Sequence, residues 1–315
     1  MRVRFLVACL AAGFIATTCY GANPVPKLDG DWWRIASNPD LGELTSPKQQ
    51  PVDFAVWQAA DGTWQLWSCI RHTKEGGHTR LFHAWQGKAL TDSDWSPRGV
   101  VMRAKPELGE VEGGLQAPYV VKQNDSYVMF YGDWERIRIA FSSDGKEFTR
   151  SSAMVTNPAD AYLFSDGIGN NTRDPMLIEI GGVWHCYYCA ERTSGGFFVR
   201  RSKDLLGDWG QSKPIKVCSL GRPGKNWWQA ECPHVVEHDG WFFLFRTSRY
   251  DDEPITTVYR SRDHLDFGID DDSKIVATLP LAAPEYIRVD GQDYLAALTP
   301  QLDGIRIVKL RWDGE

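Results

Sequence analysis

The sequence predicts an all-β protein that folds as a five-bladed β-propeller. One hairpin pattern recurs five times along the 315 residues, and its copies begin 51 to 64 residues apart. Further apolar strand segments follow the hairpins, which gives about four strands in each unit. Five consecutive four-stranded units of this length are typical of a propeller.

The five hairpins have the same internal order. Each begins with a pair of residues, here called the mouth dipeptide, followed by a proline (Phe54 in the first copy), an apolar strand, a tight turn and an aromatic-rich strand. The turns suit the positive backbone angles of short hairpin loops. The copies are VDFAVWQAADGTWQLWSC from 52, QAPYVVKQNDSYVMFYG from 116, RDPMLIEIGGVWHCYYC from 173, ECPHVVEHDGWFFLFRT from 231 and AAPEYIRVDGQDYLAAL from 282.

Third and fourth strands complete the units. We expect third strands from residues 137, 197 and 257, and fourth strands from 99, 213 and 274. Trp32 to Ile35 precede the first unit and are expected to add an outer strand to the last blade. A β-sandwich is the alternative fold, but it does not explain why turn, proline and aromatic strand recur in register.

Residues 1–22 have the layout of a secretory signal peptide, with Arg2 and Arg4 before an apolar run. A lipoprotein signal ending at Cys19 is the alternative. We therefore expect a secreted or periplasmic protein whose single propeller domain spans 23–315. No later segment has the roughly 20 consecutive apolar residues that would span a bilayer.

Charge and cysteine content exclude several classes of protein. The net charge of −6 becomes −8 when Arg2 and Arg4 are removed, which argues against nucleic acid or an anionic membrane as partner. Five cysteines remain after residue 22, an odd number that does not form a disulfide framework. Cys186 and Cys189 lie three apart in a strand, so they face opposite sides and are expected to be packed thiols.

The mouth dipeptides hold the candidate catalytic residues. The first strand of each propeller blade lines the central channel, so the five dipeptides should converge at one end of the axis. Three of them supply acids, namely Asp53, Asp174 and Glu231. Converging carboxylates repel one another and raise some of their pKa values, as a general acid and its ionised partner in glycoside hydrolysis require.

The motifs RDP at 173–175 and ECP at 231–233, with an upstream aspartate, resemble the catalytic motifs of glycoside hydrolase families 43 and 32, which are five-bladed furanosidases. The resemblance implies that Asp53 is the base or nucleophile, Glu231 the general acid and Asp174 the acid that orients substrate. It also implies that Gln116 binds substrate. PVDFAVW replaces the family 32 first-blade motif, and no room remains for that family's usual β-sandwich domain.

Other side chains complete the predicted site. Arg173 is either a partner of Asp174 or a clamp on sugar hydroxyls, and His234 is expected inside the channel. Among the tryptophans, Trp228 in GKNWWQAE and Trp57 are candidates for stacking on a sugar ring. No cofactor or catalytic metal is expected, although the resemblance allows a structural cation near the axis.

The sequence thus predicts a glycoside hydrolase that releases a terminal arabinose, xylose or fructose unit from an oligosaccharide or polysaccharide. A carbohydrate-binding propeller without activity, a glycoside phosphorylase of similar shape and a sialidase-like enzyme are the alternatives. The sugar, the linkage, the stereochemical outcome and the oligomeric state stay open.

Overall fold

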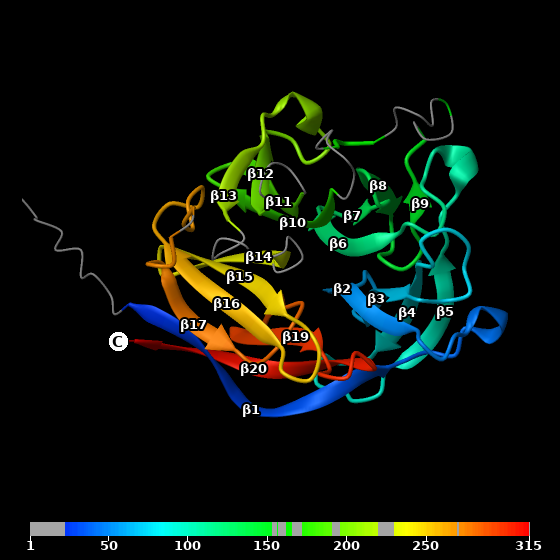
Figure 1. Ribbon diagram of the computed structural model, residues 1–315, viewed down its shortest axis with the longest axis horizontal. Coiled ribbons are helices and arrows are strands. Elements are labelled where there is room, and N and C mark those ends of the chain that lie inside the picture. The colour runs from blue at the N-terminus through cyan, green and yellow to red at the C-terminus, as the bar shows by residue number, and fades with distance from the viewer. Residues whose placement is uncertain are drawn as a thin grey trace, which may run out of the picture.

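The computed structural model describes residues 23–152, 156, 162–165, 172–190, 196–219, 230–269 and 271–314. The predicted signal peptide lies outside these residues. Within them, five four-stranded antiparallel sheets form the five blades, which confirms the predicted fold. β2, β6, β10 and β14 lie around the centre of the disc, while β1, β5, β9, β13 and β17 lie at its outside (Figure 1).

Each blade is a meander in chain order, except the fifth. Blade one has β2 (Gln50–Gln58), β3 (Trp64–Arg71), β4 (Leu81–Gly87) and β5 (Ser96–Met102), and blade two has β6 (Gln116–Gln123), β7 (Ser126–Gly132), β8 (Ile137–Ser142) and β9 (Thr149–Arg150). Blade three has β10 (Arg173–Ile180), β11 (Val183–Cys189), β12 (Phe197–Ser202) and β13 (Ile215–Cys218), and blade four has β14 (Glu231–His238), β15 (Trp241–Arg249), β16 (Ile255–Ser261) and β17 (Ile275–Leu279).

Blade five combines the two ends of the described chain. Its inner strands are β18 (Glu285–Val289), β19 (Gln292–Leu298) and β20 (Gly304–Gly314), and its outer strand is β1 (Pro24–Ser37). β1 pairs with β20 from Pro24 opposite Gly314 to Ser37 opposite Gly304. The predicted outer strand at Trp32–Ile35 is therefore confirmed, and it is longer than the sequence indicated.

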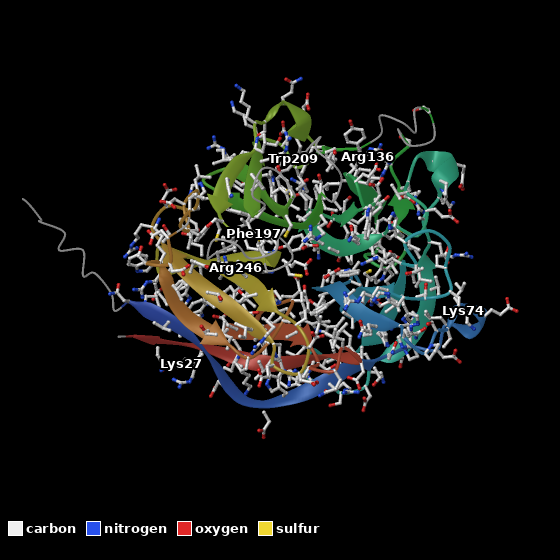
Figure 2. All side chains as sticks on the ribbon, viewed as in Figure 1. Lys27, Lys74, Arg136, Phe197, Trp209 and Arg246 are labelled. Atoms are coloured by element: carbon white, nitrogen blue, oxygen red, sulfur yellow. The ribbon has the colours of Figure 1, made fainter. Side chains whose placement is uncertain are left out.

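Side chains between the blades form the core. Figure 2 shows Phe197 and Arg246 among the buried side chains, whereas Lys27 and Lys74 project from the rim. Three of the predicted two-residue turns, Gly181-Gly182, Asp239-Gly240 and Asp290-Gly291, have positive φ at both positions, as tight hairpins require. Three short 3-10 helices, Gly42–Leu44, Pro106–Leu108 and Trp209–Gln211, complete the described elements. None of the described helices is long and apolar enough to cross a membrane.

Candidate active site

A repeated backbone irregularity marks the mouth dipeptides. The second residue of each dipeptide has positive φ, although none of the five is glycine: Asp53 (34°), Ala117 (41°), Asp174 (56°), Cys232 (52°) and Ala283 (52°). The pairing of β2, β6, β10 and β14 with the next strand shifts at this point, which is a bulge in four inner strands. Bulges re-aim side chains and are frequent beside active sites.

The bulges bring the predicted carboxylates together. Asp53 and Asp174 line a small axial cavity of about 20 Å³, with Cys232 and Glu285 also in its wall. A volume of this size is enough for about one water molecule. Glu231 lies near Asp174, because both contact Arg173. The Arg173 guanidinium is 2.8 Å from the Glu231 carboxylate and 3.7 Å from the Asp174 carboxylate. Three acids that are far apart in the sequence therefore share one site.

Asp174 is held by neighbouring strands. Its Oδ2 atom accepts a hydrogen bond from the Cys189 thiol at 3.1 Å and another from the backbone N–H of Cys232 at 3.0 Å. Its side chain is only 5% exposed. These contacts join blades three and four at the carboxylate and fix its position.

Glu231 and Asp53 are in different electrostatic environments. Glu231 accepts a 2.8 Å charge-assisted hydrogen bond from the buried Arg173 guanidinium. Burial, followed by the charges of Asp174 and Glu231, raises the pKa of Asp53 well above its ordinary value, against the opposing charges of Arg80 and Arg71. The environment thus raises the pKa of Asp53, whereas Glu231 forms an ion pair with Arg173.

The structure places the remaining predicted residues at several positions. Gln116 and Arg173 are buried in their mouth dipeptides, and the side-chain oxygen of Gln116 has no hydrogen-bond partner. His234 is buried, with its Nδ1 atom 3.5 Å from Glu285. Trp228 lies outside the described residues.

Trp57 is not brought to the carboxylates. Its ring packs against Trp67 and Phe148, and its Nε1 donates a hydrogen bond to the Gly145 carbonyl at 2.8 Å. Both Trp57 and His234 line a separate cavity of about 360 Å³ formed by residues further along the inner strands. A substrate contact by Trp57 at the carboxylate site is therefore not supported.

Several site residues were not singled out from the sequence. Arg80 and Arg71 act on Asp53 through their charge, and the Cys232 thiol lies 3.5 Å from Asp53 and 3.3 Å from the Tyr250 hydroxyl. Arg71 ends β3, which pairs with β2 beside Asp53, so the hairpin register was the available signal. No such signal marks Tyr250 in the sequence.

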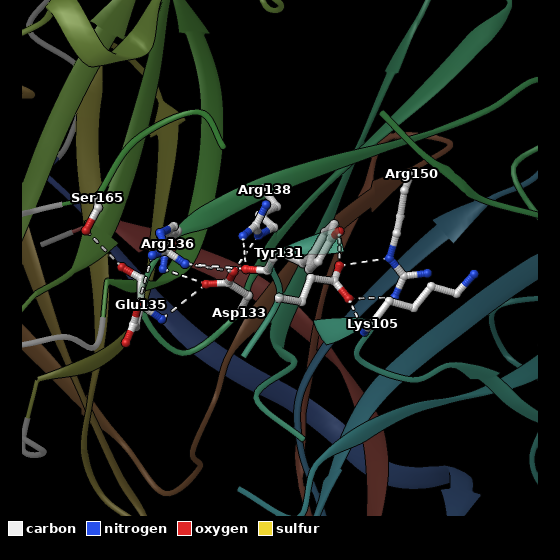
Figure 3. Close-up of polar contacts among 10 residues, drawn as sticks. Lys105, Tyr131, Asp133, Glu135, Arg136, Arg138, Arg150 and Ser165 are labelled. Carbon is white, nitrogen blue, oxygen red and sulfur yellow. Dashed lines mark hydrogen bonds and ion pairs between the residues drawn. The ribbon is translucent and has the colours of Figure 1, made fainter. Parts of the chain in front are cut away.

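The loop at 133–136 joins β7 to β8 and carries Trp134, whose ring contacts Arg80 of blade one. Trp134 has a φ of 82°, stacks on His78 with ring centroids 3.8 Å apart, and faces Arg80 at 4.7 Å. The buried Asp133 carboxylate accepts the backbone N–H of Arg136 and pairs with Arg138 (Figure 3). This buried pair fixes the loop that carries Trp134.

The five described cysteines are all free and buried, as predicted for packed thiols. Within the described part of the chain, no group of three or more His, Cys, Asp and Glu side chains is arranged to hold a metal ion.

The fold and the site define a five-bladed β-propeller with three carboxylates at one end of its axis. Solved structures share this fold. A thermostable family-43 glycoside hydrolase aligns with a TM-score of 0.58 and 16% identity, over 88% of this chain and 92% of that one. An α-L-arabinofuranosidase from Clostridium thermocellum aligns with a TM-score of 0.53 and 14% identity, over 80% and 82%.

A family 32 β-fructofuranosidase from Bombyx mori aligns with a TM-score of 0.59 and 18% identity, over 88% of this chain and 61% of that protein. The predicted resemblance to the propellers of families 43 and 32 is thus confirmed for the fold. No protein-family model matches the sequence. No curated protein matches it either.

Proposed function

We propose that this protein is a glycoside hydrolase that releases a terminal sugar of the arabinose, xylose or fructose type from a saccharide. The observation that supports the proposal is the gathering of Asp53, Asp174 and Glu231 in one site, with unlike environments for Asp53 and Glu231. Proteins of similar fold include a β-xylosidase, an α-L-arabinofuranosidase and a β-fructofuranosidase.

The proposed chemistry needs one protonated and one ionised carboxylate. The protonated acid gives its proton to the leaving glycosidic oxygen, and the ionised partner attacks the anomeric carbon or activates water. The family resemblance assigns the proton to Glu231, whereas the contacts of the substrate-free site favour a proton on Asp53. Asp174 would orient substrate, because its own position is fixed by Cys189 and Cys232.

Sugar release from xylo-, arabino- and fructo-oligosaccharides tests the proposal. We expect Asp53→Asn and Glu231→Gln each to lower kcat by about 10²-fold or more, because each removes one member of the acid/base pair. The variant that lacks the general acid should retain more activity on aryl glycosides with good leaving groups, since these need little protonation. Wild-type turnover no higher than that of both variants on all substrates would contradict the proposal.

The alternatives give different results in the same assay. A binding propeller would retain sugar in the wild type and in Glu231→Gln without cleaving it. A phosphorylase would require inorganic phosphate for turnover, and a sialidase-like enzyme would release sialic acid. The binding propeller would have lost its activity through changes in blade one. Asp53 nevertheless has the same backbone bulge as the equivalent residues of the other blades, although Phe54 replaces the proline.

A further inference from the structure

Two arginines stand opposite each other at the end of blade one that carries Asp53. Ile70 pairs with Leu81 in the antiparallel ladder of β3 and β4, so Arg71 and Arg80 occupy the next register position. Residues directly opposite in an antiparallel pair project from the same face of the sheet. The Arg80 guanidinium lies 4.7 Å from the Trp134 ring of blade two.

Among the residues that the structure describes, neither guanidinium forms an ion pair with an acid. Arg71 donates to the neutral side-chain oxygen of Gln50 at 2.8 and 3.0 Å. Arg80 donates from Nη1 to the His78 carbonyl at 3.1 Å, and its buried Nε has no partner. Buried donors are nearly always satisfied in folded proteins, so an orphaned guanidinium nitrogen beside a candidate site needs an explanation.

Two acids near this part of blade one do not pair with either arginine. Glu75 binds Arg103 through both carboxylate oxygens, at 2.8 and 2.9 Å. The backbone carbonyl of Glu112 accepts a hydrogen bond from the His78 N–H at 3.0 Å, and Glu112 makes no ion pair with Arg80 among the described residues. Asp53 is influenced by the charges of Arg80 and Arg71, without an ion pair to either.

The other arginine of the site is already engaged. Arg173 lies 2.8 Å from the Glu231 carboxylate and 3.7 Å from the Asp174 carboxylate. Arg71 and Arg80 are therefore the guanidinium groups near Asp53 that form no ion pair among the described residues. Guanidinium groups bind carboxylate, sulfate and phosphate through paired N–H donors.

We propose that Arg80 and Arg71 form an oxyanion subsite beside Asp53, and that the substrate carries a uronate carboxylate or a sulfate ester which binds there. The assignment to a sugar substrate rests on the proposed function, whereas the subsite itself does not. Trp134 and His78 would hold Arg80 in place, since a guanidinium over an aromatic face is attracted to it.

Binding to the purified protein tests the subsite with defined probes. D-Glucuronate and D-galacturonate are compared with their neutral methyl esters, D-glucose 6-sulfate with D-glucose, and inorganic phosphate is measured alone, all by titration calorimetry or ligand-observed NMR. We expect at least one acidic sugar to bind about 10-fold or more tightly than its neutral counterpart, with a preference that weakens as salt is added.

Variants locate the effect. Arg80→Gln should abolish the preference for the acidic sugar, and Arg80→Lys should retain part of it because the charge remains. Arg98→Gln is the matched control, since Arg98 is exposed on the outer strand β5. Thermal unfolding of each variant shows whether it is folded.

The outcomes separate the subsite from the hydrolase. Equal binding of acid and ester by the wild type, or a preference that survives in Arg80→Gln, overturns the subsite. Binding of inorganic phosphate alone, lost in Arg80→Gln, overturns the assignment to an acidic sugar. If the protein binds a uronate through Arg80 but cleaves no glycoside, the subsite is supported and the hydrolase is contradicted. If it cleaves neutral glycosides and shows no preference for acidic sugars, the hydrolase is supported and the subsite is contradicted.

Discussion

The ionised form of Asp53 is unfavourable in the folded protein. Its carboxylate lies among Asp174, Glu231 and buried groups, and this environment raises its pKa. When folding raises the pKa of a carboxyl group, the contribution of that group to folding stability is fully present below the pKa of the unfolded state. The contribution is lost as the pH rises through the pKa of the folded state. The ionised side chain therefore destabilises the fold near and above neutral pH.

Asp53→Asn should relieve this cost. We expect the Tm of the variant, relative to wild type, to be higher at pH 8 than at pH 5, because only ionised Asp53 is penalised. Differential scanning calorimetry at the two pH values measures the difference. Asp125→Asn, in an exposed turn, is the control and should show no such trend; an equal Tm difference for Asp53→Asn at both pH values would rule out the raised pKa.

Single residues also show where sequence reasoning stops. The mouth dipeptides identified Asp53, Asp174 and Glu231 because the blade repeat places equivalent positions around one axis. The repeat does not predict that Arg80 and Tyr250 lie near the site. They reach it from loops and strand ends, whose direction depends on how the blades tilt. The sequence predicts that the Cys189 thiol is packed, but its hydrogen bond to Asp174 depends on how β10 and β11 lie against blade four.

At the scale of elements, bulges decide which face a side chain occupies. A strand alternates its side chains between two faces, and one extra residue reverses that assignment beyond it. The bulge at Asp53 precedes Trp57 in β2, and the Trp57 ring packs against Phe148 of blade two instead of lying at the site. The sequence predicts β2 and its turn, but not the bulge, because the glycine that often marks a bulge is absent at Asp53 and Phe54.

The loop between β7 and β8 depends on one buried ion pair. Asp133 and Arg138 are both fully buried, and Asp133 also accepts two backbone N–H groups of the loop. Arg138→Met should lower the free energy of unfolding by about 3–5 kcal/mol, because it removes the close partner of a buried carboxylate and leaves only the 3.9 Å contact with Arg136. Urea denaturation gives the value.

Arg136→Gln is the matched control for this loop. Arg136 is 27% exposed and pairs with Glu135 at 3.1 Å, whereas its contact with Asp133 is longer, at 3.9 Å. Its replacement should therefore cost less than about 1 kcal/mol. If Arg138→Met cost no more than Arg136→Gln, the buried pair would not be what stabilises the loop.

At the scale of the whole molecule, β1 closes the ring of blades. The sequence predicts five units, and an outer strand at residues 32–35 because these precede the first unit. Contacts between blades, such as that of Trp134 with Arg80, could not be predicted, since they join residues that share no strand pairing.

Ile35 tests the closure by β1. Its side chain is fully buried in the core shared by blades one and five. Ile35→Ala should lower the free energy of unfolding by about 2–5 kcal/mol through lost burial and the cavity left behind. Val100→Ala, in the half-exposed outer strand of blade one, should change it by about 0.5 kcal/mol or less. Similar losses in the two variants, measured by urea denaturation, would show that β1 is not part of a cooperative ring.

The pairing of Pro24 with Gly314 brings distant parts of the chain to neighbouring positions on adjacent strands. A short peptide linker between these two residues would give a cyclic backbone without altering any blade, and new termini could then be opened at an exposed hairpin such as Asp290-Gly291. In such circular permutants the carboxylate site would be assembled from the same five strand ends, because their arrangement depends on closure of the ring and not on which blade is synthesised first.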